Sequence, residues 1–217
     1  MLQLFGHTFS SYTWKALIPL YAYEVPFEFQ MLDPEHPDNQ AVVQTRTPAG
    51  KFPLLLDGEE TVFEATAIIE YLAAILPACR PLLPSDPRAA ARMRMLDRVF
   101  DNYVMTNVNR VVWAHIANPA APDPAEIAAA GELLARTYRW LEGWLETAGQ
   151  PQAVTLVTAA AAPSLFYADW VRPIASESCP LLAAWRGALL ALPPVVRCVE
   201  DARPYRKLFP PGAPDKD

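Results

Sequence analysis

Hydroxyl side chains gather in one short stretch near the start of the sequence. Ser10, Ser11, Tyr12 and Thr13 follow one another within GHTFSSYTWKALIPLYAY, where a short apolar segment gives way to apolar residues at helical spacing. A helix that begins here presents free backbone N–H groups and the positive end of its dipole, so the position favours an anion. One hydroxyl is an ordinary N-cap, but four exceed that need. The stretch therefore favours donation of a hydrogen bond to a bound thiolate.

The elements that position this stretch belong to a small α/β unit. LQLF, FEFQM, KFPLLLDG and ETVFEA are typical of short strands, and helices are expected over residues 11–23 and 64–76. Because Asp57-Gly58 favours a hairpin between the last two strands, a mixed sheet is expected. Residues 33–48 are polar and irregular, with one helical turn at most.

A proline-rich segment, PACRPLLPSDP, separates this α/β domain, over residues 1–78, from a second region, over residues 86–217, in which the strand patterns stop. Ser85-Asp86-Pro87 is typical of a helix start, with a capping hydroxyl followed by proline in the first turn. The second region is therefore predicted to be an all-α bundle. Its helices are expected over residues 87–116, 124–147, 155–171, 180–192 and 194–202.

Composition and charge argue against several classes of protein. The chain has 217 residues, is 52% hydrophobic and carries a formal net charge of −6, with its basic residues scattered, so neither nucleic acid nor a membrane surface is an expected partner. No apolar run reaches the ~18 residues of a membrane span and no signal-peptide pattern is seen, which predicts a cytoplasmic location. Three dispersed cysteines and three dispersed histidines predict reduced thiols and no bound metal.

The chain resembles the cytosolic glutathione transferases over nearly its whole length. SSYTWKALIPL is similar to the first helix start of the serine-type members, especially the zeta class; TPAGKFPLLLDGEETVFEATAIIEYL resembles the family's most specific block; and PLLPSDPRAAAR resembles its linker. The resemblance implies a thioredoxin-like N-terminal domain, an all-α C-terminal domain, glutathione as co-substrate and a homodimer. It implies that the glutathione thiolate attacks a small hydrophobic electrophile.

Ser10 is the expected catalytic residue, because it lies at the nucleophile end of the window in which thioredoxin-type redox proteins carry Cys-x-x-Cys. No cysteine occupies this window, which disfavours thiol-disulfide exchange. Ser11 and Tyr12 are the alternatives, since a shift of one residue in the helix start changes which hydroxyl points at sulfur. A hydrogen bond and the helix dipole together supply ~2–3 kcal/mol, enough to lower a thiol pKa by about two units.

The resemblance also implies a set of glutathione-binding residues, with Ser11 and Tyr12 among them. A cis Phe52-Pro53 bond is expected, with the Phe52 backbone turned outward to pair with the cysteinyl residue; a trans proline at an edge strand is the alternative. Lys51 is expected to reach a carboxylate of the tripeptide, unless it is a solvated surface lysine. Glu64 is expected to contact the γ-glutamyl group together with the backbone of Ala65, unless it only complements the helix dipole.

Two positions depart from the family pattern. A serine usually follows the glutamate and binds the γ-glutamyl carboxylate, but Ala65 stands there, so one charge-assisted hydrogen bond of ~1.5–3 kcal/mol is expected to be missing. In TLVTAAAAPSLFYADW, Thr155 keeps the N-cap of a buried helix, whereas Thr158 replaces the usual aspartate. A reciprocal capping contact of ~1 kcal/mol is expected to be lost there.

The electrophile is expected against one stripe of the long helix, formed by Tyr103, Asn107 and Arg110, although a solvent-facing or subunit-contact stripe is the alternative. The aromatic side chains expected in the core are Trp113, Tyr167 and Trp170. A homodimer is expected to use the helix over residues 64–76 and the long helix near residues 92–98. Two other functions stay open: a glutathione-dependent isomerase or dehalogenase, and a transferase-like module that binds partners or ligands without catalysis.

Overall fold

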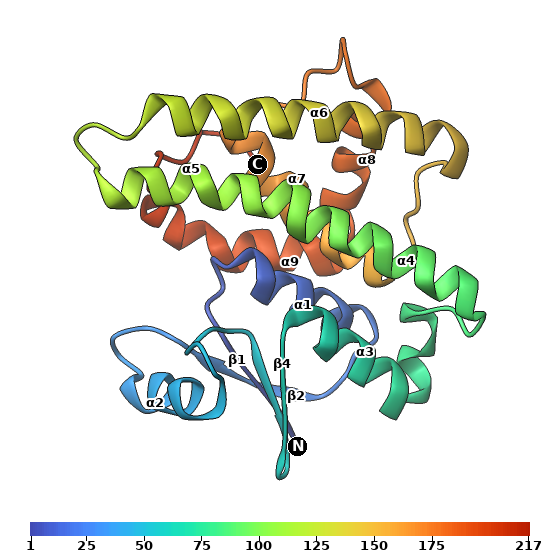
Figure 1. Ribbon diagram of the computed structural model, residues 1–217. Helices are drawn as coiled ribbons and strands as arrows, with labels where there is room; N and C mark the ends of the chain where they lie inside the picture. The colour runs from blue at the N-terminus through green and yellow to red at the C-terminus, as the bar shows by residue number, and fades with distance from the viewer.

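A mixed four-stranded sheet organises the first part of the chain in the computed structural model, which describes all residues from 1 to 217 (Figure 1). The strand order is β2-β1-β3-β4; β1 pairs with β2 in parallel, and β3 is antiparallel to both of its neighbours. The expected hairpin at Asp57-Gly58 is confirmed. The strands are β1 (Leu2–Gly6), β2 (Phe27–Met31), β3 (Leu54–Asp57) and β4 (Glu60–Phe63).

Helices cover both faces of this sheet because its strands are apolar on both sides. Leu4 and Leu55 belong to the main hydrophobic core with α1 and α3, whereas Phe5 and Leu54 pack with Val43 of α2 on the other face. Figure 1 shows α1 and α3 between the sheet and the helical part of the chain, with α2 set apart from them. The helices are α1 (Ser11–Ala22), α2 (Pro37–Arg46) and α3 (Ala65–Ile75), followed by the 3₁₀-helix η1 (Pro77–Leu82).

The helix α2 corrects the expectation of an irregular segment over residues 33–48. It has ten residues, begins at Pro37 and buries a single side chain, that of Val43. One buried position cannot produce a 3.6-residue apolar period, so the sequence pattern held no helical signal. The helix is stabilised instead by proline in its first turn and by the contacts of Val43 with Phe5 and Leu54.

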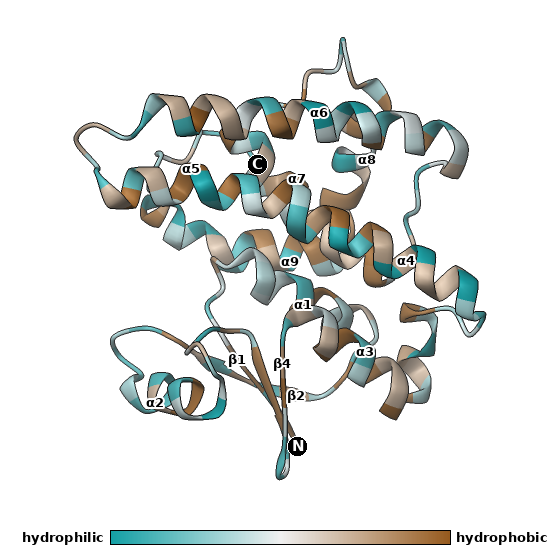
Figure 2. Cartoon of the chain, in the orientation of Figure 1, coloured by the Kyte–Doolittle hydropathy of each residue, from teal (hydrophilic) through white to brown (hydrophobic).

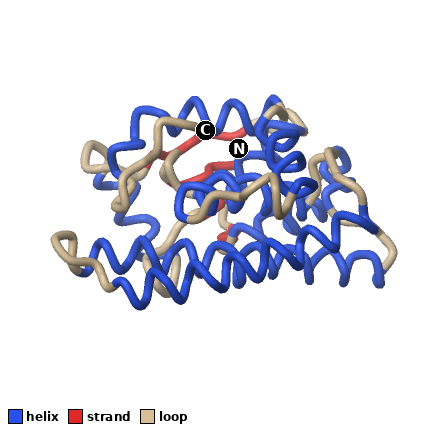
Figure 3. Tube along the Cα trace, turned by 90° about the horizontal axis from the view of Figure 1, so that it is seen from above, coloured by secondary structure: helices blue, strands red, loops and turns tan.

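The second part of the chain is all helical, as predicted, and no strand occurs after Phe63. Its centre is α7, in which every residue from Leu156 to Trp170 is buried. The view from above in Figure 3 shows helices across the whole width of the molecule, and apolar segments line the interior in Figure 2. The helices are α4 (Pro87–Val99), η2 (Phe100–Met105), α5 (Thr106–Ala117), α6 (Pro124–Ala148), α7 (Leu156–Val171), α8 (Pro180–Leu190), α9 (Pro193–Ala202) and η3 (Arg203–Leu208).

The long helix expected over residues 87–116 is continuous, but its middle, η2, is a π-helical turn. Its N-cap is the carboxylate of Asp86, which accepts from the Ala89 N–H at 2.8 Å, and not the expected hydroxyl of Ser85. No single helix is long and apolar enough to cross a membrane; α8 with the helix over 193–208 passes that test only as a pair bent by 80°.

The N-terminus of α7 corrects a second expectation. The Thr155 hydroxyl accepts from the Thr158 N–H, and the Thr158 hydroxyl accepts from the Thr155 N–H at 2.8 Å. Thr158 also donates to the carbonyl of Ala153 at 2.8 Å. The reciprocal cap is therefore kept, because a threonine hydroxyl supplies the acceptor for which a carboxylate was thought necessary.

Candidate active site

The start of α1 places its hydroxyls at a cavity between the two parts of the chain. Ser10 is the N-cap, with extended backbone (φ −97°), and its Oγ accepts from the Thr13 N–H at 3.3 Å. Because the cap uses Ser10 only as an acceptor, its O–H is left to donate to a ligand. Ser11 is the first helical residue and is 9% exposed, and Tyr12 is half-buried. All three line a cavity of about 440 Å³.

The loop before Ser10 is fixed by side chains from both parts of the chain. Trp14 of α1 donates from Nε1 to the Thr8 carbonyl at 2.5 Å, and Tyr167 of α7 donates to the Phe9 carbonyl at 2.8 Å. The Phe9 N–H donates to Nδ1 of His7 at 3.0 Å, an acceptor role that suits a ring whose pKa is lowered by burial. The helix start is therefore held at the cavity by contacts that do not depend on a ligand.

A second cavity, of about 280 Å³, continues the first toward the start of α3. Four residues line both cavities, so the two form one groove: Tyr12, Lys51, Phe52 and Asn109. The second cavity adds Pro53, Glu64 and Ala65, and the Phe52-Pro53 bond is cis, as expected. The structure thus brings together every residue proposed from the sequence for catalysis and glutathione binding.

Glu64 has an unusual backbone conformation at the wall of this groove. It is the N-cap of α3 with φ of 70°, in the left-handed region, and its side chain makes no capping hydrogen bond. Such a conformation costs a residue other than glycine about 1–3 kcal/mol and is typical of functional sites. Glu64 is exposed, whereas Ala65 behind it is buried.

A buried lysine links the groove to the long helix. Lys15, which is 2% exposed, places Nζ 2.6 Å from Oδ1 of Asp97 and 2.8 Å from both carboxylate oxygens of Asp101, and donates to the Thr66 hydroxyl at 2.9 Å. Arg98 binds Asp97, the Thr66 hydroxyl and, at 3.2 Å, Oδ2 of Asp101. Two cations therefore balance two acids, as buried charges require.

This network also acts on two groups that line the groove. Burial raises the pKa of Asp101, and Lys15 opposes that effect while Asp97 adds to it. Burial, with the nearby carboxylates of Asp101 and Glu64, raises the pKa of Tyr12 to about 12. Tyr12 is therefore a neutral phenol at physiological pH and can donate a hydrogen bond, but it is not a base.

The stripe proposed for the electrophile lies elsewhere. Tyr103, Asn107 and Arg110 line another cavity, of about 750 Å³, over η2, α5 and α6, which shares only Asn102 with the groove. Arg110 pairs there with Glu126 at 2.6 Å, and Asn107 donates to the Tyr103 carbonyl at 2.8 Å. Helical spacing placed the three residues on one stripe, and they do line one cavity, but the spacing could not show which side of the helix faces Ser10. The residues of the long helix that line the Ser10 cavity are Met105, Val108, Asn109, Val112, Trp113 and Ile116.

Trp113 corrects another expectation, since it is 63% exposed and lines the groove instead of the core. Tyr167 and Trp170 are buried as expected, at 4% and 9% exposure. Lys15, Arg98 and Asp101 were missed, because charges on two helices that are far apart in sequence give no local signal of their pairing.

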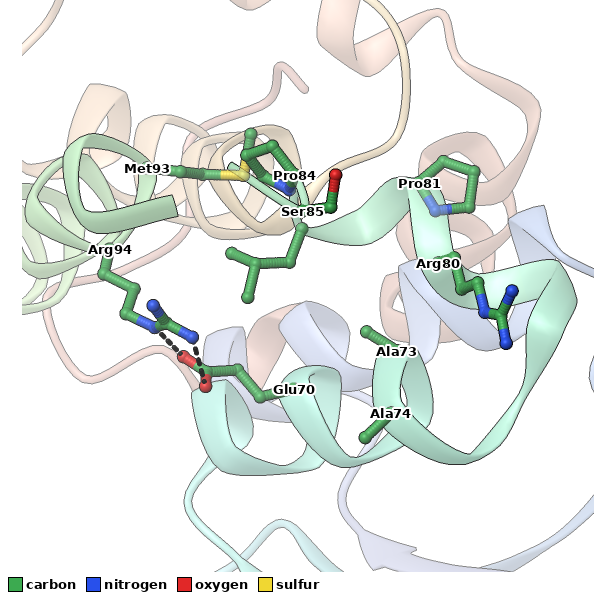
Figure 4. A pocket seen from close by; sticks show the side chains of 10 residues that line it. Glu70, Ala73, Ala74, Arg80, Pro81, Pro84, Ser85, Met93 and Arg94 are labelled. Carbon is green, nitrogen blue, oxygen red and sulfur yellow. Dashed lines mark hydrogen bonds and ion pairs between the residues drawn. The ribbon is translucent and has the colours of Figure 1, made fainter. Parts of the chain in front are cut away.

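A further cavity, of about 670 Å³, lies away from Ser10 at the junction of α3, η1 and α4. Figure 4 shows its side chains, among which Arg94 binds Glu70 through Nε at 2.7 Å. It shares no lining residue with the groove, so it takes no part in the chemistry described here.

These features define a class of protein: a thioredoxin-like domain with a hydroxyl-bearing start of α1 and a cis-proline, joined to a helical bundle. The family model for the glutathione S-transferase N-terminal domain matches residues 4–78. Glutathione S-transferase 3 of Zea mays is 29% identical over 154 residues, which are 67% of this chain and 69% of that protein. Residues 4–78 therefore form a glutathione S-transferase N-terminal domain, and the chain as a whole has the fold of the glutathione S-transferases.

Two further relatives extend the comparison. A glutathione S-transferase of Arabidopsis thaliana is 37% identical over 75 residues, but the match spans 33% of this chain and only 35% of that protein. The structure of maleylacetoacetate isomerase from Anaeromyxobacter dehalogenans, with glutathione bound in its active site, is 26% identical with a TM-score of 0.71, covering 94% of this chain and 97% of that one.

Proposed function

We propose that this chain is a glutathione transferase that binds glutathione along the groove from α1 to α3 and activates its thiol with Ser10. The observation that carries the proposal is the continuity of the groove. Ser10 lies in one cavity, Glu64 and Ala65 lie in the other, and Phe52 lines both. A tripeptide paired with the Phe52 backbone would place its sulfur near Ser10 and its γ-glutamyl end near Ala65.

In this mechanism the Ser10 O–H donates a hydrogen bond to the sulfur and stabilises the thiolate. The Thr13 N–H that binds Ser10 Oγ polarises the hydroxyl and makes it a better donor. The sulfur lone pair then forms a bond to the electrophilic carbon, and the electron pair of the broken bond leaves with the leaving group. Ser10 is not covalently modified. The apolar walls formed by Val108, Val112 and Phe209 suit a small hydrophobic electrophile.

A glutathione-dependent isomerase is the second candidate function. It is favoured by the similarity to maleylacetoacetate isomerase, which covers 94% of this chain, together with the pair Ser10-Ser11 at the start of α1. The first step is common to both functions, since the thiolate adds to a carbon of the substrate. They differ in whether glutathione stays on the product.

Three measurements test this function in sequence. Retention of the protein on immobilised glutathione is expected, and its absence would end the proposal. Thiolate absorbance of bound glutathione, titrated with pH, should give a pKa below that of free glutathione. Product analysis with an aryl halide and with a cis-alkene dicarboxylate then separates a conjugate from an isomer.

We propose that the protein is a cytoplasmic homodimer. The three cysteines are buried and unpaired, which suits a reducing compartment. Exposed apolar side chains of the long helix and α6 line the cavity of about 750 Å³, with Met95 at 52%, Tyr103 at 58% and Trp140 at 48% exposure. Together with the outer face of α3, this surface suits a second copy of the chain. A monomeric mass by light scattering at micromolar concentration would rule the dimer out.

A further inference from the structure

The γ-glutamyl half of the groove lacks a hydroxyl but holds a guanidinium. The side chain of Ala65 offers no hydrogen bond, and it lines the cavity together with Arg98 of α4. Arg98 also donates to the hydroxyl of Thr66, the residue that follows Ala65 in the first turn of α3. The cation therefore lines the same cavity as the position that the missing hydroxyl would occupy.

We propose that Arg98 binds the α-carboxylate of the γ-glutamyl residue of glutathione and replaces the hydroxyl absent at Ala65. This inference rests on the proposed function. A guanidinium N–H donates a charge-assisted hydrogen bond to a carboxylate, which is stronger than the neutral hydrogen bond that a serine hydroxyl donates. Arg98 would thus restore the missing contact with a charged donor, and it would favour ligands with a free carboxylate at this end.

The surroundings of Arg98 suit this role. Its Nε and Nη2 atoms make the contacts with Asp97, Thr66 and Asp101, which leaves Nη1 for a ligand, and the side chain is 47% exposed. The contacts hold the guanidinium in one orientation before a ligand arrives, so little side-chain entropy is lost on binding.

The charges around Arg98 suit a ligand group that carries both an ammonium and a carboxylate. Lys15 and Arg98 balance Asp97 and Asp101, so the four groups together carry no net charge. The γ-glutamyl end of glutathione is also neutral overall, with one carboxylate and one ammonium. Arg98 offers a donor to the first, and the carboxylate of Glu64 at the cavity wall offers an acceptor to the second.

The simplest competing role for Arg98 is to neutralise Asp97, which is fully buried. That role concerns stability alone. A variant at Arg98 would then weaken the binding of every glutathione analogue to the same degree. A role in carboxylate binding predicts instead that the loss depends on whether the ligand has the carboxylate.

Isothermal titration calorimetry with two ligands separates these roles. One ligand is glutathione; the other is γ-aminobutyryl-Cys-Gly, which differs only in lacking the α-carboxylate. We expect the wild type to bind glutathione about 10- to 100-fold more tightly than the analogue, and Arg98→Gln to bind the two within about threefold of each other. Arg94→Gln is the matched control, since Arg94 lies on the same helix, is 45% exposed and pairs with Glu70 outside the groove. It should behave as the wild type.

Three outcomes overturn the inference. Equal affinity of the wild type for both ligands would do so without any variant, and therefore decides the matter even if Arg98→Gln does not fold. An equal loss for both ligands in Arg98→Gln would assign Arg98 to stability. Unchanged discrimination in a folded Arg98→Gln would assign the carboxylate to another group. If the wild type binds neither ligand, the proposed function itself fails.

Discussion

The two ends of the groove are built from different kinds of side chain. The end at Ser10 has neutral hydroxyls and apolar walls, whereas the end at Ala65 has a network of Lys15, Asp97, Arg98 and Asp101. A hydroxyl stabilises a thiolate with a hydrogen bond and adds no positive charge. A cation beside the sulfur would stabilise the thiolate more strongly and make it less reactive. Charges can hold the remote, unreactive end of a substrate. If glutathione binds as proposed, affinity and reactivity are assigned to separate ends of one ligand.

This division has a physical advantage for catalysis. Binding energy from a part of the substrate that does not react can be used to hold the reacting atom in place. The charged end is rigid because its members bind one another, and the Ser10 end is rigid because Trp14 and Tyr167 fix the preceding loop. Variants at the two ends should therefore fail in different ways.

The largest effect is expected at the charged end, for Lys15→Met. The change leaves Asp97 and Asp101 with only the half-exposed Arg98 as a partner, and an uncompensated buried charge costs about 3–5 kcal/mol. Urea unfolding followed by circular dichroism measures the loss. Lys207→Met, at an exposed lysine, is the control and should change the free energy of unfolding by less than about 0.5 kcal/mol. A loss for Lys15→Met as small as that of the control would show that the network adds nothing to stability.

The next effect is expected at the other end, for Ser10→Ala. Loss of a charge-assisted hydrogen bond of ~1.5–3 kcal/mol should raise the pKa of the bound thiol by about one to two units. Glutathione affinity should stay within a few fold, and stability should fall by no more than ~1–2 kcal/mol as the cap is lost. Thiolate absorbance against pH measures the shift. An unchanged titration here with a shifted one in Ser11→Ala would move the role to Ser11.

A smaller effect is expected for Ala65→Ser. If the γ-glutamyl carboxylate already binds Arg98, the restored hydroxyl should tighten glutathione binding by less than about threefold in the wild type, but by about tenfold in the Arg98→Gln background. Neither variant should alter the pKa of the thiol. Calorimetry of the four proteins measures the coupling. A gain of up to a hundredfold in the wild-type background would show that no side chain binds the γ-glutamyl carboxylate in the natural protein, and would contradict the role of Arg98.

The smallest effect is expected for Tyr12→Phe. The pKa of Tyr12 in the folded protein is about 12, above its ordinary value of 10, so the phenol stays protonated throughout the neutral range. The pH–rate profile between pH 6 and 9 should therefore keep its shape. At alkaline pH the wild type should lose stability relative to the variant from about pH 10 to pH 12, because the unfolded chain ionises first. If the pH–rate profile of the wild type shows a pKa between 6 and 9 that is absent in Tyr12→Phe, that pKa belongs to Tyr12 and the prediction is wrong.

The fold was largely predictable because local patterns specify it. Short apolar segments and turn residues predicted the strands, and proline with a polar cap predicted the start of α4 at Pro87. The failures occurred where tertiary contacts replace local ones. The helix α2 is stabilised by Val43 alone, and the cap of α7 uses a hydroxyl of Thr158 in a role expected of a carboxylate. The domain limits of 1–78 and 86–217 stay predictions.

The groove was predictable on one side only. The residues proposed in the first domain came from motifs with fixed spacing, and Ser10, Phe52 and Glu64 all line the groove. Residues of the second domain had to be chosen from a helix that has polar stripes on two sides. Tyr103 was chosen and faces away, whereas Arg98 faces the groove. The side that faces the first domain depends on how the two parts dock, which helical periodicity does not encode.

The position of Lys15 limits how this protein can exchange parts with its relatives. The lysine belongs to α1, and the two carboxylates that pair with it belong to α4 and η2. Each half of the molecule therefore neutralises a charge that the other half buries. A hybrid protein that joined this first domain to a foreign helical domain would bury the ammonium of Lys15 without a carboxylate to pair with it. Such hybrids should misfold unless the incoming half carries an acid at the same place. The two halves are therefore matched to each other at this position.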